Sequence, residues 1–251
     1  MQATVGFEID QRLGILTLAR PASNNACDPA FIDGLAAAAL AATDADIGAL
    51  LIRADGANFC VGADLKHLAS VKGDLADALD AMAITFHHAV TLLADLPVPV
   101  IGAVQGHAVG AGFGLALVCD QLLIADGARF STGYARLGLS ADAGVSFHLT
   151  RALGVRQARS LLMVPRTIGA AEMIAFGLAD AIVADTGLQA EALRRAHALA
   201  VGPTDAFAVI KQLTGRALDH DLAAHLDLER TEIVSLTRRP DAQQRIAAVL
   251  G

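Results

Sequence analysis

The sequence predicts an α/β fold, because apolar runs typical of buried strands alternate with longer segments of helical periodicity. The runs at 49–53 and 98–104 are each followed by small residues and then by a helical pattern. The 251 residues, 54% of them hydrophobic, suffice for one sizeable core and a small appendage. No low-complexity segment and no clear linker interrupts the chain.

The N-terminal part predicts a hairpin and then a helix. Residues 7–18 contain two short strand-like runs around a turn at 11–14, which is the pattern of a β-hairpin. Asp28 followed by Pro29 is an N-cap and first-turn signature. We expect the helix that begins there to extend to about residue 42.

The middle of the chain predicts a long helix over 74–96, which Pro97 ends. Its apolar side chains recur at spacings of three and four, as on the buried face of a helix. This stripe consists of Leu75, Leu79, Met82, Phe86, Val90 and Leu93.

The remaining chain predicts one more strand, then a segment rich in turns, and then mostly helices. Residues 121–125 predict a strand, and 127–146 are rich in small and turn-forming residues. Helical patterns fill most of the C-terminal part, at 191–201, 204–218 and 222–236.

Composition excludes several functional classes. The net charge of −7 and the pI near 5.5 argue against nucleic acid as a partner. Residues 1–10 lack the basic and apolar regions of a secretory signal, and no apolar run is long enough to span a bilayer. Cys27, Cys60 and Cys119 lack metal-ligand spacing and fit reduced thiols. We therefore expect a cytoplasmic protein without a metal, a membrane partner or a nucleic-acid partner.

The sequence predicts a catalytic site at a glycine-rich stretch, residues 106–120, which reads GHAVGAGFGLALVCD. A glycine-rich turn between a strand and a helix lets the backbone approach a ligand and leaves the first N–H groups of the helix unbonded. Such donors suit an oxygen that is becoming negative. We expect them at Ala111 and Gly112. The glycine spacing does not match the dinucleotide fingerprint, and no Lys-Ser/Thr pair of a P-loop comes after it.

Another turn of the same kind, the first turn in chain order, strengthens this interpretation; the glycine-rich turn at 106–120 is the second turn. Residues 58–65, NFCVGADL, also follow a predicted strand and also open a helical pattern. Two strand-to-helix turns that each offer a backbone N–H are what a two-donor oxyanion hole requires. The alternative is that both turns serve only tight packing between strand and helix.

These motifs resemble those of the crotonase superfamily, the enoyl-CoA hydratases and isomerases. The resemblance covers most of the chain in the expected order, through Arg20-Pro21 with Asn25-Ala26, 59–65, 106–120, 138–154 and 172–180. It implies a spiral core of ββα units over 1–195 and a helical trimerisation region over 196–251. It also implies an acyl-CoA thioester as substrate, no separate cofactor, and trimers that often pair into hexamers. The thioester oxygen is then expected between the N–H groups of Ala63 and Ala111.

The residues at the acid–base positions differ from those of the hydratases in this family, which use two glutamates. The matching positions here are Gly114 and Tyr134, and neither carries a carboxylate. Asp142 matches the aspartate that shuttles a proton in related isomerases, although Ala141 and Val145 replace the proline and second glycine of their motif. An apolar pocket would make this carboxylate a usable base. The alternative, or an additional role, is that Asp142 caps the next helix.

His87 and Tyr134 allow another interpretation. In register, His87 matches the histidine, Asp142 the nucleophilic aspartate and Tyr134 the tryptophan of the 4-chlorobenzoyl-CoA dehalogenases of the same superfamily. The chain is poor in the aromatic residues that build their aryl pocket, and for His87 alone we favour an ordinary histidine on a helix flank. Tyr134 either donates a hydrogen bond in the pocket or packs as a half-buried aromatic residue. His88 is expected, like His148, to be structural or on the surface.

The resemblance also suggests residues that bind CoA. The backbone of Ala63, Asp64 and Leu65 is expected along the adenine, with Asp64 also capping a helix. Arg20 and Lys66 are candidates for the phosphates, or else exposed bystanders. Gly110 completes the expected contacts. The basic tail found in many relatives is missing here or replaced by Arg238 and Arg239.

We therefore predict an enoyl-CoA isomerase with Asp142 as its base. The alternatives are a hydratase, a dehalogenase-like or hydrolase-like member of the same family, and a non-catalytic protein that binds CoA thioesters.

Overall fold

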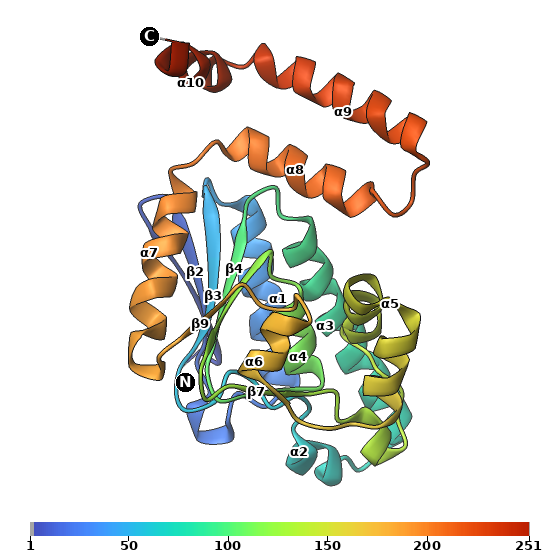
Figure 1. The fold of residues 1–251 in the computed structure, drawn as a ribbon. Coiled ribbons are helices and arrows are strands. Elements are labelled where there is room, and N and C mark those ends of the chain that lie inside the picture. Colours follow the sequence, from blue (N-terminus) through green and yellow to red (C-terminus); the bar gives the residue numbers. More distant parts are fainter. Residues whose placement is uncertain (1–2, 251) are drawn as a thin grey trace.

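The computed structural model describes residues 3–250, which form two β-sheets surrounded by helices (Figure 1). The larger sheet has six strands in the order β1-β2-β3-β4-β6-β9. β1 is antiparallel to β2, and all the other neighbours are parallel. The strands are β1 (Val5–Asp10), β2 (Leu13–Leu18), β3 (Ala49–Ala54), β4 (Val100–Val104), β6 (Gln121–Ala125) and β9 (Ala181–Val183).

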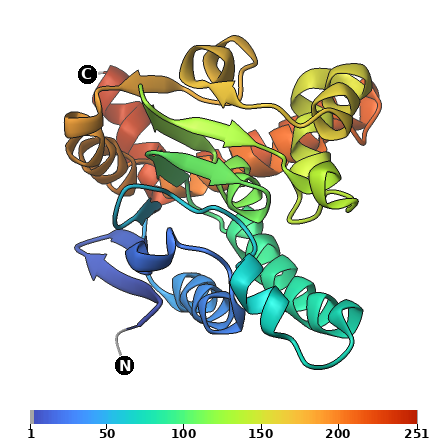
Figure 2. The same cartoon turned by 90° about the horizontal axis from the view of Figure 1, so that it is seen from below.

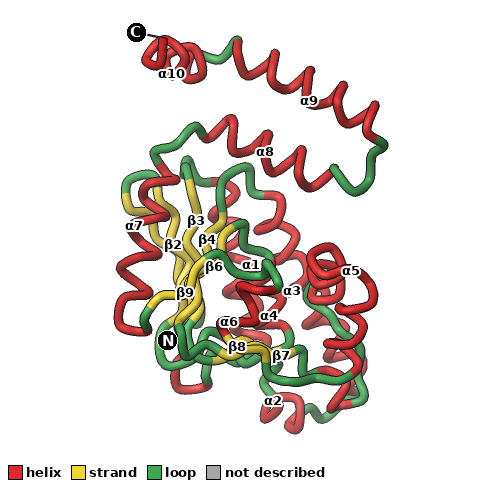
Figure 3. The backbone as a smooth tube through the Cα atoms, viewed as in Figure 1, coloured by secondary structure: helices red, strands yellow, loops and turns green. Residues whose placement is uncertain are grey.

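The smaller sheet contains β5 (His107–Val109), β7 (Arg129–Ser131) and β8 (Ile168–Gly169). β5 follows β4 and β7 follows β6 after a few residues, so successive turns of the chain place one strand in each sheet. Figure 3 shows β7 and β8 at the lower end of the molecule, below the strands of the larger sheet. In Figure 2, β5 and β7, drawn in green, lie side by side, as their parallel pairing requires. This repeating arrangement confirms the expected spiral of ββα units.

Helices cover both faces of the larger sheet. α1 (Pro29–Asp44) packs against α3 (Leu75–Asp95), and α7 (Leu188–Ala200) lies on the opposite face (Figure 1). The first two confirm the predicted helices. Asp28 Oδ1 accepts the Phe31 amide at 2.8 Å, so Asp28 is the predicted N-cap. The remaining helices of the core are α2 (Leu65–Ser70), α4 (Ala111–Leu117), α5 (Val145–Met163) and α6 (Ala170–Ala175), with single 3₁₀ turns η1 (Pro21–Ser23), η2 (Tyr134–Leu137) and η3 (Asp185–Gly187).

The core fills the space between sheet and helices. Its largest fully buried side chains include Phe31 from α1, Phe59 from the first turn, Phe113 from α4 and Phe130 from β7. The phenyl rings of Phe113 and Phe130 lie 5.4 Å apart, which joins the second turn to the smaller sheet. Both turns of the candidate site are therefore anchored in the core by aromatic side chains.

The C-terminal region contains α8 (Thr204–Arg216), α9 (Leu222–Thr237) and α10 (Pro240–Leu250). In Figure 1 these helices lie beyond the end of the larger sheet, with α9 and α10 farthest from the core. None of the three contains a buried residue. α8 is tied to the core by Lys211, whose Nζ lies 2.7 Å from Asp120 Oδ2 and donates to the Val98 carbonyl at 3.1 Å.

Candidate active site

The first predicted turn is held between two neighbouring segments by main-chain hydrogen bonds. Cys60 forms a bridge with β5, and Ala63 forms a bridge with Cys27. In the second bridge the Cys27 amide donates to Gly62 O at 2.8 Å, and the Asp64 amide donates to Cys27 O at 2.9 Å. Backbone groups alternate between the two sides of an extended segment. The N–H of Ala63 therefore points away from Cys27, and Ala63 itself is exposed.

The second predicted turn leads into Ala111, whose backbone amide makes no hydrogen bond with any described residue. The Gly110 amide donates to Ser131 O at 3.0 Å, while the amides of Phe113 and Gly114 both donate to Gly110 O. This leaves the half-buried Ala111, at the start of α4, with its N–H available. Gly110 has a φ of 54°, a conformation that favours glycine.

The two turns lie in direct contact. A Cβ on Gly62, whose φ is +80°, would lie 2.6 Å from Val109 O and 3.5 Å from the Ala111 nitrogen. A Cβ on Gly112 would lie 2.1 Å from Cys60 O. Only glycine permits this approach. The structure thus brings together the two turns that carry Ala63 and Ala111.

Tyr134 and Asp142 form a hydrogen-bonded pair beside the second turn. The phenol of Tyr134, at the start of η2, donates to Asp142 Oδ1 at 2.6 Å. The same phenol lies beside Gly110, since a Cβ there would be 3.8 Å from the Tyr134 oxygen. Burial raises the pKa of Tyr134 well above its ordinary value, and the Asp142 carboxylate raises it further. Tyr134 therefore stays protonated and acts as a hydrogen-bond donor.

The interpretation of Asp142 as a helix cap is wrong. α5 begins at Val145 with Gly144 as its N-cap, and no side chain makes a cap hydrogen bond. Ala143 and Gly144 both have positive φ, 52° and 76°, so the chain turns sharply before the helix starts. Asp142 is an exposed residue whose Oδ1 instead accepts from Tyr134. This frees the carboxylate from a structural role in α5.

Gly114, the position matching a hydratase glutamate, has no space for a side chain. A Cβ there would lie 2.3 Å from Ala143 O and 2.9 Å from Ala143 Cβ. Real Cβ contacts are not that short, so the loop that carries Asp142 occupies the space of that side chain. Neither position that matches a hydratase glutamate, 114 or 134, therefore presents a carboxylate, and Asp142 is the carboxylate that lies next to both.

His87 reaches this loop from α3. Its Nε2 accepts the Ala143 amide at 3.1 Å, which requires an unprotonated Nε2. The sequence favours a helix-flank histidine, and no local pattern could reveal this contact because the two residues are 56 positions apart. His88 is exposed, as expected. His148 is half-buried on α5, where burial and then Arg151 lower its pKa.

The residues predicted to bind CoA lie beside the first turn. Asp64 caps α2, as predicted, and accepts the Lys66 and His67 amides at 3.0 and 3.1 Å. These bonds, with a contribution from Arg20, hold the pKa of Asp64 below its usual range. Leu65 and Lys66 are exposed. Arg20 does not extend into solvent, because its guanidinium contacts Ala26 O and the Asp28 and Asp64 carboxylates.

Two cysteines lie together beneath the first turn. Cys27 and Cys60 are buried, and their sulfur atoms are 3.6 Å apart without a disulfide. The hydrogen bond to Cys60 and burial raise the pKa of Cys27. Because both side chains are buried, they pack as small apolar groups where the first turn meets the Cys27 segment. Cys119 lies apart from them, and burial raises its pKa as well.

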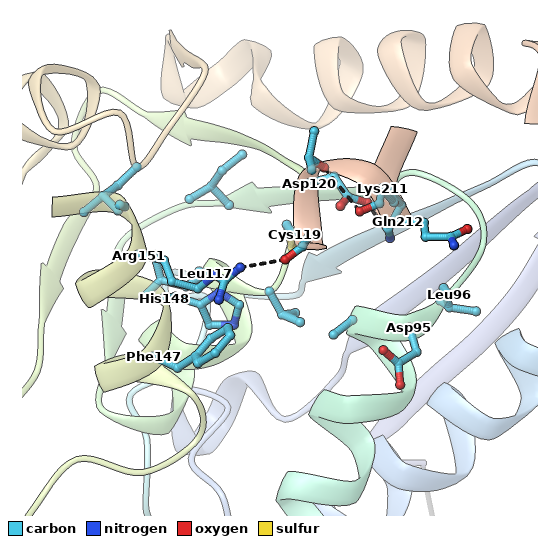
Figure 4. Close-up of a pocket in the computed structure, with 18 of the residues that line it drawn as sticks. Asp95, Leu96, Leu117, Cys119, Asp120, Phe147, His148, Arg151, Lys211 and Gln212 are labelled. Atoms are coloured by element: carbon cyan, nitrogen blue, oxygen red, sulfur yellow. Dashed lines mark hydrogen bonds and ion pairs between the residues drawn. The ribbon is translucent and has the colours of Figure 1, made fainter. Parts of the chain in front are cut away.

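A cavity of about 900 Å³ lies away from both turns and is lined in part by α8 (Figure 4). Its walls include the end of α3, the end of α4 and the first turns of α5. The Lys211–Asp120 ion pair lies on one side, and the Arg151 guanidinium lies 4.9 Å from the centre of the Phe147 ring on the other. None of the predicted catalytic residues lines it. The volume of a cavity alone indicates no chemistry, so the two turns remain the candidate active site.

Residues 3–250 contain neither a metal-binding cluster nor a membrane-spanning helix. No group of three or more His, Cys, Asp or Glu side chains in this range has a geometry that suits a metal ion. No helix in it combines the length and the apolar character needed to cross a membrane.

Comparison with known proteins identifies relatives over nearly the whole chain. Residues 8–249 match the family model described as enoyl-CoA hydratase/isomerase. The "Probable enoyl-CoA hydratase echA8" of Mycobacterium tuberculosis is 35% identical over 248 residues, 98% of this chain and 95% of that protein. The 1,2-epoxyphenylacetyl-CoA isomerase of Escherichia coli is 33% identical over 209 residues, 83% of this chain and 80% of that one. A crystal structure of an enoyl-CoA hydratase from Polaromonas sp. JS666 superposes with a TM-score of 0.92 at 33% identity, covering 98% and 96% of the two chains.

The Tyr134–Asp142 pair predicts an unusual alkaline titration. Tyr134 is the only tyrosine and the chain has no tryptophan, so phenolate absorbance reports on this residue alone. Because the pKa of Tyr134 is raised in the folded state, the native protein should show no phenolate near pH 10, where an unfolded tyrosine titrates. The stability that this shift contributes is complete below the unfolded pKa and is lost as the pH rises above it.

The control is the same protein unfolded in guanidinium, which should titrate near pH 10. Asp142→Asn should lower the native pKa of Tyr134 towards, but not to, that value, because burial remains. A native protein that titrates like the unfolded one would contradict the burial of the Tyr134 phenol.

Proposed function

The chain belongs to the enoyl-CoA hydratase/isomerase family, and on that premise we propose that it shifts the double bond of an enoyl-CoA thioester, with Asp142 as the base. The family is one of enzymes that act on acyl-CoA thioesters, so the two turns are the expected place for the thioester carbonyl. The position of the double bond in the substrate is proposed as one carbon farther from the thioester than in the product.

The two backbone amides would stabilise the charged intermediate. Removing a proton from the carbon next to a thioester carbonyl forms an enolate, and its negative charge collects on the carbonyl oxygen. Donors aimed at that oxygen lower the barrier by about 3 kcal/mol each. The N–H groups of Ala63 and Ala111 make no hydrogen bond with any described residue, and their turns are in contact.

The observation that carries the proposal is the single carboxylate at this site. Hydration needs one group to activate water and another to deliver a proton. Here Ala143 fills the space at Gly114, and position 134 carries a phenol whose raised pKa keeps it protonated. A double-bond shift needs only one base, because the proton removed from one carbon is returned to another.

The hydrogen bond from Tyr134 suggests how Asp142 performs both transfers. The hydrogen bond from Tyr134 engages Oδ1 of Asp142, which leaves Oδ2 of the same carboxylate to carry the proton. Asp142 would take a proton from the carbon next to the thioester and form the dienolate. It would then return the proton two carbons farther along the chain. The carboxylate is regenerated, and no atom is gained or lost overall.

A second candidate is a hydrolytic reaction of the dehalogenase type, favoured by the contact between His87 and Ala143. In that reaction Asp142 would attack the aryl carbon that carries the halogen, and halide would leave. A histidine would then activate water to hydrolyse the aryl ester of Asp142, which regenerates the carboxylate and releases the hydroxylated product. His87 lies next to the loop that carries the nucleophile. Its Nε2 would first have to exchange the Ala143 amide for water, which makes this candidate the weaker one.

Assays with two substrates separate the candidates. Conversion of a 3-enoyl-CoA, with no loss of the conjugated absorbance of crotonyl-CoA, supports the isomerase. Loss of the crotonyl-CoA signal supports a hydratase, release of halide from an aryl-CoA supports the hydrolytic reaction, and binding without turnover supports a scaffold.

Asp142→Asn should lower kcat for the 3-enoyl-CoA by about 100- to 10,000-fold, the usual contribution of a general base. Thioester affinity should stay nearly unchanged, because the turns are intact. Asp95→Asn, an exposed aspartate at the end of α3, is the matched control and should keep full activity. An Asp142→Asn variant as active as the control would remove Asp142 from the mechanism.

We also propose that the chain assembles into trimers through its C-terminal helices. α8, α9 and α10 contain no buried residue, yet they expose large apolar side chains. Apolar surface on this scale usually marks an interface. The side chains on these helices are Ile210, Leu222, Leu226, Ile233, Val234, Ile246, Val249 and Leu250, and Leu218 is exposed between α8 and α9.

Sedimentation should therefore give three times the mass of the 25.8 kDa chain. Ile233→Glu should shift the population towards monomer, because it places a charge in the proposed apolar interface. Glu232→Gln, one residue away on α9, is the matched control and should leave the mass unchanged. A wild-type chain that stays monomeric throughout a concentration series would exclude this assembly.

A further inference from the structure

Arg20 joins two segments that meet beside the first turn. Its Nη1 donates to Ala26 O at 2.7 Å, and its Nη2 lies 3.0 Å from Asp28 Oδ2 and 3.5 Å from Asp64 Oδ2. The side chains of Arg20, Asp28 and Asp64 are 21%, 21% and 14% exposed. Partial shielding from water makes such ion pairs stronger than fully exposed ones. One guanidinium therefore connects two carboxylates from distant parts of the chain.

Each carboxylate divides its two oxygens between a helix and Arg20. Asp28 Oδ1 accepts an amide from the first turn of α1, and Asp64 Oδ1 accepts two amides from the first turn of α2. The Oδ2 atoms of both residues face the same nitrogen of Arg20. Arg20 thus sets the distance between the starts of α1 and α2.

The Ala63 amide lies between the hydrogen bonds that this arrangement supports. Cys27 donates to Gly62 O and accepts from the Asp64 amide, so the residues on both sides of Ala63 are held by the segment next to Asp28. A shift of that segment relative to Asp64 would turn the Ala63 N–H. The direction of this N–H therefore depends on the contacts of Arg20.

The main chain of Arg20 is held independently of its side chain. The Arg20 amide donates to Asn25 Oδ1 at 2.7 Å. Asn25 is fully buried and donates to Asp55 O at 3.0 Å and to Asn58 O at 2.9 Å. Replacing only the guanidinium leaves these bonds in place, so substitution of Arg20 tests the side-chain contacts alone.

We propose that Arg20 is a positioning residue that aims the Ala63 N–H at the thioester oxygen by holding Asp28 and Asp64 at a fixed separation. This inference rests on the proposed function, which gives the Ala63 amide its role. It replaces the expectation that Arg20 binds a CoA phosphate, because a phosphate would compete with two carboxylates and a carbonyl oxygen for the same guanidinium.

The test compares Arg20→Met and Arg20→Lys with Arg53→Met. Misdirecting a catalytic donor costs up to about 100-fold in rate, so Arg20→Met should lower kcat by about 10- to 100-fold. Its Kd for CoA without an acyl group should not change. Arg20→Lys keeps a positive charge and should recover part of the loss. The opposite result, a raised Kd for CoA at unchanged kcat, would identify a phosphate ligand and overturn the proposal.

Arg53 is the matched control because it is also half-buried and paired. Its Nε donates to Thr17 Oγ1 at 3.0 Å, and its Nη2 lies 3.3 Å from Glu8 Oε1, with 27% of the side chain exposed. It lies on β3, and these two side-chain contacts are with strands β2 and β1 rather than with either turn. Arg53→Met should keep the wild-type kcat. An equal loss in both variants would point to general destabilisation and overturn the role of Arg20.

A spectroscopic readout separates this proposal from the proposed function. Butyryl-CoA, isotopically labelled at the thioester carbonyl, has no double bond to move, and hydrogen bonds lower its carbonyl stretching frequency. Binding to the wild type should lower that frequency, and binding to Arg20→Met should lower it less. A wild type without any shift overturns the oxyanion hole and the role of Arg20 with it. A shift that Arg20→Met fully preserves overturns only the role of Arg20.

Discussion

The candidate site depends on two backbone turns that approach each other more closely than side chains allow. A carbonyl oxygen of each turn occupies the space where a glycine of the other turn would carry a Cβ: Val109 O at Gly62, and Cys60 O at Gly112. Bridges at Cys27–Ala63 and Cys60–Ala108 extend this contact into the surrounding chain. The donors are therefore main-chain groups fixed by the fold, and the fold can present them without any particular side chain at Ala63 or Ala111.

The side chains proposed to take part in the reaction come from elements that are independent of these turns. Tyr134 belongs to η2, Asp142 to the loop before α5, and His87 to α3. They meet because the loop at Ala143 packs directly on α4 and binds His87. Two backbone donors fixed by the fold can be combined with different side chains from these separate elements. This would explain how a family with one fold includes members named for different reactions. In this chain the proposed set has one carboxylate, Asp142, which accepts a hydrogen bond from the phenol of Tyr134.

Much of the fold could be predicted from periodicity, and the parts that could not are short or depend on distant contacts. The helix over 74–96 and the N-cap at Asp28 leave local patterns and were predicted closely. Strands β5, β7 and β8 have only two or three residues, too few for a recognisable alternation. The two turns were found from glycine spacing and family resemblance. The partners of Asp142, the contact of His87 and the pairing of Cys27 with Cys60 join residues that are not neighbours in sequence, and no local pattern records them.

The packing of Gly114 against Ala143 constrains how this protein can change over evolutionary time. A lone replacement of Gly114 by glutamate would add a side chain where a carbonyl oxygen already lies. The loop that carries Asp142 would have to move at Ala143 before a glutamate could fit there. A sequence with a carboxylate at position 114 therefore needs a different loop as well, so we expect these two parts of the chain to change together.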